Sequence, residues 1–523
     1  MKYCATLDNF PLFLVSFPKD ADFEIFSKKA ERHCCHSAGI VSRNVRIEKR
    51  TDEKCDKTQK KYVNRIVLQI KIAIFADEKC DNVTKKVCIM IIRRDRYLKQ
   101  LIARKKDGMI KIVTGIRRCG KSYLLNVLFR QYLIDEGTEE RDIIMMALDE
   151  DTNIRYRNPL ELGKFIREQC ADQSRFFYVL LDEIQKVDSI QNPYLPDNPN
   201  EKIGFVDVLL GLKKLPNVDL YVTGSNSRML SVDILTEFKD RGEEIRINPL
   251  CYDEFVSAYQ GDKQMAWTEF LMYGGMPFVM SKSGHADKAA YLHDLFERTY
   301  ITDVIERNSL KGSKDVLEDL LDFLASSVGS LTNTTRLENT FKSERRVNIS
   351  HNTIAAYIDC FIDAFILKKA MRYDIKGRKY IGAQQKYFYS DVGLRNARLN
   401  FRQQEENHIM ENIIYNELTA RGFSVDVGVV ETTFTGDDGK RQRSLLEVDF
   451  VCHQGHARYY IQSALTVAEE SKRLQEINSL TKINDSFVKI VVVRDHIIRW
   501  HDEAGILYIG IEDFLLNYIN QME

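Results

Sequence analysis

The chain lacks the features that would place it in a membrane, among secreted proteins or among polybasic proteins. Its most apolar run, residues 66–75, is interrupted by Gln69 and Lys71, so no segment reads as a membrane span. The first residues include Asp8 and Pro11, where a secretion signal would be continuously apolar. Lys and Arg together number 76, as do Asp and Glu, which excludes a wholesale polybasic protein but not a local basic patch.

Paired cysteine spacing is also missing. The 523 residues include 11 cysteines, but these do not form the short, regular frame of a disulfide-rich secreted domain. We therefore expect free thiols, a reducing cytoplasmic setting and no membrane partner. The length suggests about three domains.

Glycine is scarce in the first 89 residues, which hold only Gly39 of the 26 glycines in the chain. The same segment holds six of the 11 cysteines and carries 18 Lys and Arg against 12 Asp and Glu. The remaining residues therefore carry 58 against 64, and this composition shift marks a boundary. We predict that residues 1–89 are an N-terminal extension of doubtful status and that Met90 is the working start.

A phosphate-binding pattern follows the first clear strand. Residues 110–114 are rich in β-branched side chains, which predicts a buried strand. The apolar residues in 123–136 have helical spacing, which predicts a helix. Between them the spacing G-x-x-x-x-G-K-S is formed by Gly115, Ile116, Arg117, Arg118, Cys119, Gly120, Lys121 and Ser122.

These residue types suit a nucleotide. Gly115 and Gly120 let the backbone curl so that its amides point at phosphate oxygens. Lys121 would reach the β- and γ-phosphates, and the Ser122 hydroxyl would bind Mg²⁺. ATP and Mg²⁺ are therefore the expected cofactors, and a plain glycine turn before a helix is the alternative.

Two acids end the next buried strand. Residues 176–181 form a continuous apolar run, as in a strand buried on both faces, and Asp182 and Glu183 follow it. We predict that Asp182 holds Mg²⁺ through water and that Glu183 is the general base for the attacking water. The alternative is a strand end with two solvated acids.

Further polar residues follow the strand predicted at residues 219–223. Ser225 or Asn226 would sense the γ-phosphate at this strand end, with a simple turn as the alternative. Strands at residues 143–148 and 244–247 complete a five-stranded, doubly wound α/β sheet.

Arg241 lies just before the last of these strands. It would reach the γ-phosphate of a neighbouring subunit as an arginine finger, which implies a homo-oligomer. A solvated loop charge is an equal alternative.

These segments, together with residues 248–255 and 273–277, resemble a prokaryotic family of AAA-type ATP-binding P-loop proteins with a C-terminal region of uncharacterised role. The resemblance covers the chain from residue 90 onward. It implies an ATPase whose nucleotide site is the set of residues named above, but no particular biological process.

Helices are expected after the ATPase core, at residues 288–307, 314–327 and 350–367, with a helix N-cap at Ser350. With the extended segments 366–375 and 386–390, they suggest a winged helix. Its residues nearest to DNA would be Arg345, Arg346, His351 and Asn352. Because Asp359 and Asp363 would oppose phosphate, we slightly favour protein docking over DNA binding.

The C-terminal segment resembles a restriction-endonuclease-like fold. Glu411 on a helix, Asp449 on a strand and Gln462 on the next strand match the Mg²⁺-binding acids and amide of that fold. The lysine of the pattern is replaced by Ala464, which has no amine to assist the nucleophile. We therefore predict a nuclease-like domain without cleavage activity.

We thus predict an extension (1–89), an AAA-type ATPase core (90–260), a helical lid with a winged-helix-like region (261–400) and a nuclease-like domain (401–523). The favoured function is a Mg²⁺-dependent ATPase acting as a nucleotide-driven switch on a protein or nucleic-acid partner. The alternatives are an ATP-licensed nucleic-acid-processing enzyme and a protein that binds ATP without turnover.

Overall fold

The computed structural model describes residues 92–522, apart from 199, 225–240, 309–313, 383, 403–404 and 436–440. It also describes strands β1 (Lys2–Leu7), β2 (Phe13–Ser16) and β3 (Val45–Arg46), which form one antiparallel sheet. The chain divides into two units, Met1–Ile89 and Met90–Glu523. The start at Met90 stays a prediction. All of the elements that follow belong to the second unit.

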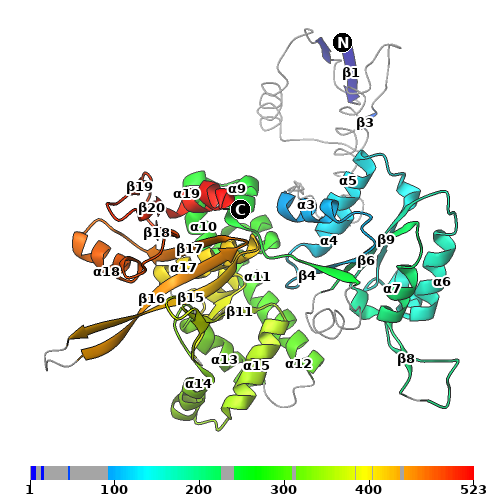
Figure 1. Ribbon diagram of the computed structural model, residues 1–523. Coiled ribbons are helices and arrows are strands. Elements are labelled where there is room, and N and C mark those ends of the chain that lie inside the picture. The colour runs from blue at the N-terminus through cyan, green and yellow to red at the C-terminus, as the bar shows by residue number, and fades with distance from the viewer. Residues whose placement is uncertain are drawn as a thin grey trace. The chain divides into compact units, whose positions relative to one another are not determined.

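A five-stranded parallel sheet with the strand order β10-β4-β9-β6-β5 forms the centre of the core predicted at residues 90–260 (Figure 1). The strands are β4 (Ile110–Thr114), β5 (Ile143–Ala147), β6 (Phe177–Asp182), β9 (Val218–Thr223) and β10 (Gly242–Arg246). All five predicted strands are present, and the parallel P-loop-type sheet is confirmed. Because β9 lies between β4 and β6, the carboxyl ends of these three strands are neighbours.

Both faces of this sheet are covered by helices. Val113, Leu180 and Tyr221 belong to one core, which includes side chains of α3 (Asp95–Ala103). Their neighbours in sequence belong to a second core with α6 (Pro159–Gln169) and α7 (Phe205–Leu212). Burial on both faces explains why these strands have continuous apolar sequences.

The helix after β4 runs without interruption from Lys121 to Asp135. It consists of α4 (Lys121–Tyr123), a central π-helical segment (Leu124–Phe129) and α5 (Arg130–Asp135). The predicted helix is present, but its periodicity did not indicate the π-helical segment. Gly137 has a φ of +98° and Thr138 N donates to the Leu133 carbonyl at 3.0 Å, so the helix ends at a C′ glycine.

A helical region follows the core. Its helices are α9 (Tyr252–Ala258), α10 (Ala266–Tyr273), α11 (Gly284–Asp294), η7 (Leu295–Ile301), α12 (Thr302–Asn308), α13 (Lys314–Ser326), α14 (Thr334–Thr340) and α15 (His351–Asp363). Ser350 Oγ accepts from Thr353 N at 3.2 Å, which confirms the predicted N-cap. The expected strand at 366–375 is divided: β11 (Leu367–Ala370) pairs with β14 (Lys386–Tyr389), and β12 (Arg372–Asp374) joins the C-terminal sheet.

The C-terminal part contains an eight-stranded sheet with the order β13-β12-β15-β16-β17-β18-β20-β19. Its strands are β13 (Lys379–Tyr380), β15 (Ser424–Thr435), β16 (Arg441–Gln454), β17 (Ala457–Ala464), β18 (Val488–Val493), β19 (Trp500–His501) and β20 (Leu507–Gly510), besides β12. Helices α17 (Glu406–Ala420) and α18 (Glu470–Thr481) contribute to its two separate apolar cores. None of the helices in the described ranges has the length and apolarity needed to cross a membrane.

Residues 92–522 hold five cysteines, all of them buried: Cys119, Cys170, Cys251, Cys360 and Cys452. Cys119, Cys170, Cys251 and Cys452 are free thiols, as predicted. The predicted helix around Glu411 and the strands around Asp449 and Gln462 are present as α17, β16 and β17.

A buried ion pair joins two central strands of the ATPase sheet. Lys111 Nζ on β4 donates to Asp219 Oδ1 on β9 and to Asp107 Oδ1, both at 2.6 Å. Asp219 also accepts from Lys106 N and from the Tyr221 hydroxyl at 2.8 and 2.9 Å. The side chain of Lys111 is fully buried, and of these two carboxylate partners Asp219 is buried whereas Asp107 is 30% exposed.

We expect Asp219→Ala to lower the free energy of unfolding by about 3–5 kcal/mol, because it leaves a buried ammonium with one half-exposed partner. Urea denaturation would measure the loss. Asp107→Ala is the matched control and should cost about 1 kcal/mol or less. Equal losses for the two variants would contradict this account of the pair.

Candidate nucleotide site

The loop between β4 and α4 has an unusual backbone. Gly115 and Gly120 have φ values of +140° and +100°, and Arg118 has +65°. A Cβ at Gly115 would lie 2.2 Å from the Ile247 carbonyl oxygen, so only glycine fits there. The helix begins directly after this loop, and a helix N-terminus offers free amides and a positive dipole end to an anion.

Lys121 extends back over the loop. Its Nζ donates to the carbonyl oxygens of Gly115 at 3.0 Å and Ile116 at 3.2 Å, and the residue is 4% exposed. The neighbouring Ser122 is exposed at the first turn of the helix. The loop therefore combines a preformed cationic group with a hydroxyl, which are the groups that a nucleotide phosphate and its metal ion require.

The acids predicted after β6 lie at the same edge of the sheet as the loop. Asp182 is buried at the end of β6, and its Oδ1 accepts a bond from the Thr223 hydroxyl at the end of β9. Thr223 Oγ1 in turn accepts from Glu183 N at 2.9 Å. One hydroxyl thus fixes both acids, and Asp182 and Ser122 are oxygen donors of the kind that Mg²⁺ prefers.

Glu183 has a left-handed backbone with a φ of +53°, an uncommon conformation for a residue other than glycine. Gln185 Nε2 donates to Glu183 Oε2, so the carboxylate has a definite orientation. Backbone strain of this kind concentrates at functional positions.

The helical region contacts the loop directly. Arg117 Nη1 pairs with Asp303 of α12 at 3.0 Å, and the Tyr300 hydroxyl of η7 donates to the Arg117 carbonyl at 2.9 Å. A conformational change in the loop would therefore alter its contacts with the helices that follow the core.

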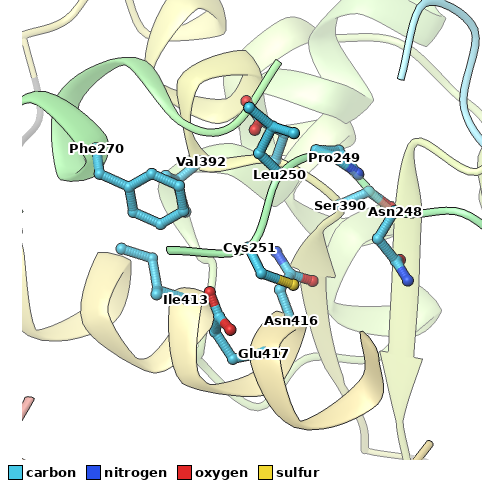
Figure 2. Close-up of a pocket in the computed structure, with 11 residues that line it drawn as sticks. Asn248, Pro249, Leu250, Cys251, Phe270, Ser390, Val392, Ile413, Asn416 and Glu417 are labelled. Carbon is cyan, nitrogen blue, oxygen red and sulfur yellow. The ribbon is translucent and has the colours of Figure 1, made fainter. Parts of the chain in front are cut away.

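A second route leaves the loop through residues 247–252, which we call the coupling segment. Cys119 Sγ lies 3.7 Å from the Ile247 carbonyl oxygen, and Leu250 N donates to the Gly275 carbonyl at 2.8 Å. At its far end, Tyr252 N donates to Glu417 Oε1 of α17 at 2.6 Å. Figure 2 shows this segment, with Cys251 and Glu417, at a small pocket between the core and α17.

Charged groups surround the end of the coupling segment. Cys251, Asp253 and Glu417 present possible metal-ligand atoms within 4.8 Å of one another. Arg421 pairs with Glu417 at 2.5 Å and with Asp253 at 3.5 Å, and Arg96 with Asp253 at 3.4 Å. The guanidinium groups of Arg421 and Arg96 therefore neutralise the negative charge of this cluster. We call these two arginines and the cluster the joint.

A buried carboxyl, that of Asp391, holds the backbone of Gly275, whose carbonyl accepts from Leu250 of the coupling segment. Asp391 Oδ2 accepts from Gly275 N at 2.6 Å, and Asp391 Oδ1 accepts from Leu394 N at 3.1 Å. Burial raises the pKa of Asp391 to about 6, although these backbone amides oppose the rise.

The predicted site also included Ser225, Asn226 and Arg241. Ser225 and Asn226 lie outside the described residues. The carbonyl of Arg241 accepts from Ile110 N at 3.0 Å, at the amino end of β4. About 16 Å of strand separate this end from the loop, so Arg241 cannot serve the site of its own chain. Its action on a neighbouring subunit stays a prediction.

Sequence reasoning missed Thr223. The search for a polar sensor began after the strand, whereas the side chain that contacts both acids is the last residue of the strand itself. The signal was present, because a threonine ends β9 in the strand next to β6.

The nuclease-like residues of the C-terminal part are also brought together. Glu411 and Asp449 both contact Lys386 Nζ, at 3.1 and 3.7 Å, and Gln462 Oε1 accepts from Asp449 N at 3.4 Å. Ala464 has no amine, as expected, but an ammonium reaches this centre from another strand. The ammonium comes from β14, far from position 464 in sequence, so no spacing rule indicated it.

The sheet order, the glycine loop and the acids at the ends of neighbouring strands define a P-loop ATPase. Comparison with known families agrees: residues 107–256 match an AAA domain, and residues 264–405 match a domain of unknown function. An uncharacterised protein of Haemophilus influenzae is 31% identical over 434 residues, which cover 82% of this chain and 99% of the relative. The chain belongs to this family of AAA-domain proteins, in which a domain of unknown function follows the ATPase core.

More distant similarities were also found. An uncharacterised protein of Methanocaldococcus jannaschii is 26% identical over 440 residues, 81% of this chain and 88% of the relative. A Walker-type ATPase of Pyrococcus abyssi is similar in structure with a TM-score of 0.41 and 15% identity, over 61% of this chain and 99% of the other. The ORC1 protein of Aeropyrum pernix, solved in complex with DNA, has a TM-score of 0.27 and 12% identity, over 61% and 95%.

We expect Lys121→Ala to abolish ATP binding, because it removes the ammonium that faces the phosphates. Glu183→Gln should retain binding and lose hydrolysis by about 10²–10⁴-fold, the usual contribution of a general base. Equilibrium binding of ATP and release of phosphate would separate the two effects. Substantial turnover by Glu183→Gln would assign the base elsewhere.

Thr223→Val should retain ATP binding and slow hydrolysis about 10–100-fold, because the hydroxyl that aligns both acids is lost. Phosphate release at saturating ATP would measure this effect. Thr223→Ser keeps the hydroxyl and is the control, with expected activity near that of wild type. A normal rate for Thr223→Val would show that this hydroxyl has no positioning role.

Proposed function

We propose that the chain is a Mg²⁺-dependent ATPase that acts as a nucleotide-driven switch on a partner. In this proposal Lys121 binds the β- and γ-phosphates, Ser122 and Asp182 hold the metal ion, and Glu183 accepts the proton of the attacking water. When bound, Mg²⁺ would neutralise charge on the phosphates. Thr223 would keep both acids in position through its hydroxyl.

The contact between the loop and the coupling segment carries the switch proposal. The loop packs tightly at Gly115, where a Cβ would lie 2.2 Å from the Ile247 carbonyl oxygen, so a change in loop shape at this residue would act on Ile247. The segment that begins at Ile247 ends on Glu417 of α17. Movement of the loop would therefore act on a helix of the C-terminal part.

Helix α17 connects two centres. Glu417 accepts from the coupling segment, and Glu411 belongs to the acidic centre around Lys386. The two residues are about 9 Å apart along the helix axis at 1.5 Å per residue. A rigid helix would pass a shift at one centre to the other.

Protein docking is supported better than DNA binding for the winged-helix-like region. Arg345 pairs with Asp319 at 2.8 Å, and His351 contacts Glu338 at 3.2 Å. Two of the four groups proposed to meet DNA are therefore already next to carboxylates. This charge pairing favours a protein partner, and the winged-helix and nuclease-like fold assignments remain part of the proposal.

Hydrogen exchange would test the switch. In Glu183→Gln, we expect ATP to change the protection of the coupling segment and of α17. Glu183→Gln/Glu417→Gln should still bind ATP but lose the response of α17, because the acceptor of Tyr252 N has become neutral and its bond to Arg421 is weakened.

Glu406→Gln in the same background is the matched control, since Glu406 lies on α17 but pairs with Arg494 at 3.1 Å, away from the coupling segment. It should leave the ATP response of α17 intact. If ATP binds to Glu183→Gln and α17 exchanges at the same rate with and without it, the switch proposal fails.

A further inference from the structure

One lysine ammonium lies among three carboxylates in the C-terminal part. Lys386 Nζ is 2.7 Å from Glu447 Oε1, 3.1 Å from Glu411 Oε2 and 3.7 Å from Asp449 Oδ1. Glu411 comes from α17, Glu447 and Asp449 from β16, and Lys386 from β14. Three carboxylates from two elements therefore surround an ammonium from a third element. We call these four groups the Lys386 centre.

The centre is buried. The side chains of Lys386, Glu411 and Asp449 are 3%, 6% and 8% exposed, and only Glu447 is partly open at 36%. A site that cleaves nucleic acid must admit a phosphodiester and water. The acids that would do this chemistry are closed off from solvent.

Three surrounding carboxylates favour the charged form of Lys386. Burial alone would lower its pKa, but the carboxylates of Glu411, Asp449 and Glu447 outweigh burial and raise that pKa above its usual value. Burial, followed by the charge of Glu411, raises the pKa of Asp449 above its usual range.

Neighbouring contacts hold the lysine in place. Asn412 Oδ1 accepts from Tyr389 N at 2.9 Å, and Asn412 Nδ2 donates to the Tyr389 carbonyl at 2.7 Å. These two bonds join α17 to β14 one residue from Glu411. Asp449 is held separately, since its Oδ2 accepts from Ser463 N at 2.8 Å.

A divalent metal ion does not fit this arrangement. The acids that would bind it in a nuclease-like fold already share a cation, and an ion next to the Lys386 ammonium would meet like-charge repulsion in a poorly solvated site. We propose that the Lys386 ammonium takes the place of the divalent metal ion, so that this domain is metal-independent and α17, β14 and β16 are joined by an internal cation. The centre then serves to connect elements and does not cleave nucleic acid.

This inference is independent of ATP hydrolysis and predicts that removing the lysine creates a metal site. Nucleotide-free full-length Lys386→Met should bind one more equivalent of Mn²⁺ than wild type, measured by electron paramagnetic resonance of free Mn²⁺. The same variant should show a Mn²⁺-dependent rise in melting temperature that wild type lacks.

Two variants control the measurement. Lys369→Met removes an exposed lysine of β11 and should bind no additional Mn²⁺. Lys386→Met/Asp449→Asn removes one of the carboxylates, and the gained site should disappear. If Lys386→Met does not fold in metal-free buffer, the proposal requires Mn²⁺ to restore its folding.

Three results would overturn the proposal. The first is a Mn²⁺ equivalent that binds to wild type and is lost in Asp449→Asn, since the lysine would then not have taken the metal's place. The second is a folded Lys386→Met without an additional site, and the third is an unfolded Lys386→Met that Mn²⁺ does not rescue.

Discussion

The close approach of Gly115 to the Ile247 carbonyl is the constraint on which the rest of the account depends. It leaves no space for a side chain at the start of the phosphate loop, and it places that loop against the segment that follows the last strand of the sheet. Packed interiors respond to such contacts by discrete rearrangement and not by gradual deformation. A phosphate that changes the shape of the loop would therefore either move the coupling segment or be opposed by the packing of that segment.

Buried ion pairs extend the connection from the coupling segment into the C-terminal part. Arg421 neutralises the joint at Glu417, and Lys386 neutralises the centre at Glu411, on the same helix. Buried ion pairs contribute little net stability, but losing one partner is costly. Such pairs suit elements that must keep one register, and the chain uses its own cations at both positions.

The sequence predicted the ATPase core well because its signals are local. Strand, glycine loop and helix follow one another from Ile110 to Asp135, and apolar runs mark the strands that are buried on both faces. The position of Asp182 and Glu183 at the end of a buried strand was predicted for the same reason. Contacts between distant segments were not predicted. Thr223 was not predicted as a site residue, although it ends a predicted strand. Lys386 contacts Asp449, which lies 63 positions later in the chain, and no spacing pattern in the sequence indicates this contact.

The most direct test is an experimental structure of Glu183→Gln with ATP and Mg²⁺ bound. The account predicts that the Lys121 ammonium leaves the carbonyls of Gly115 and Ile116 for the phosphates, and that the contact between Tyr252 and Glu417 changes with it. ATP bound in the loop, with the coupling segment and α17 in their present positions, would contradict the account.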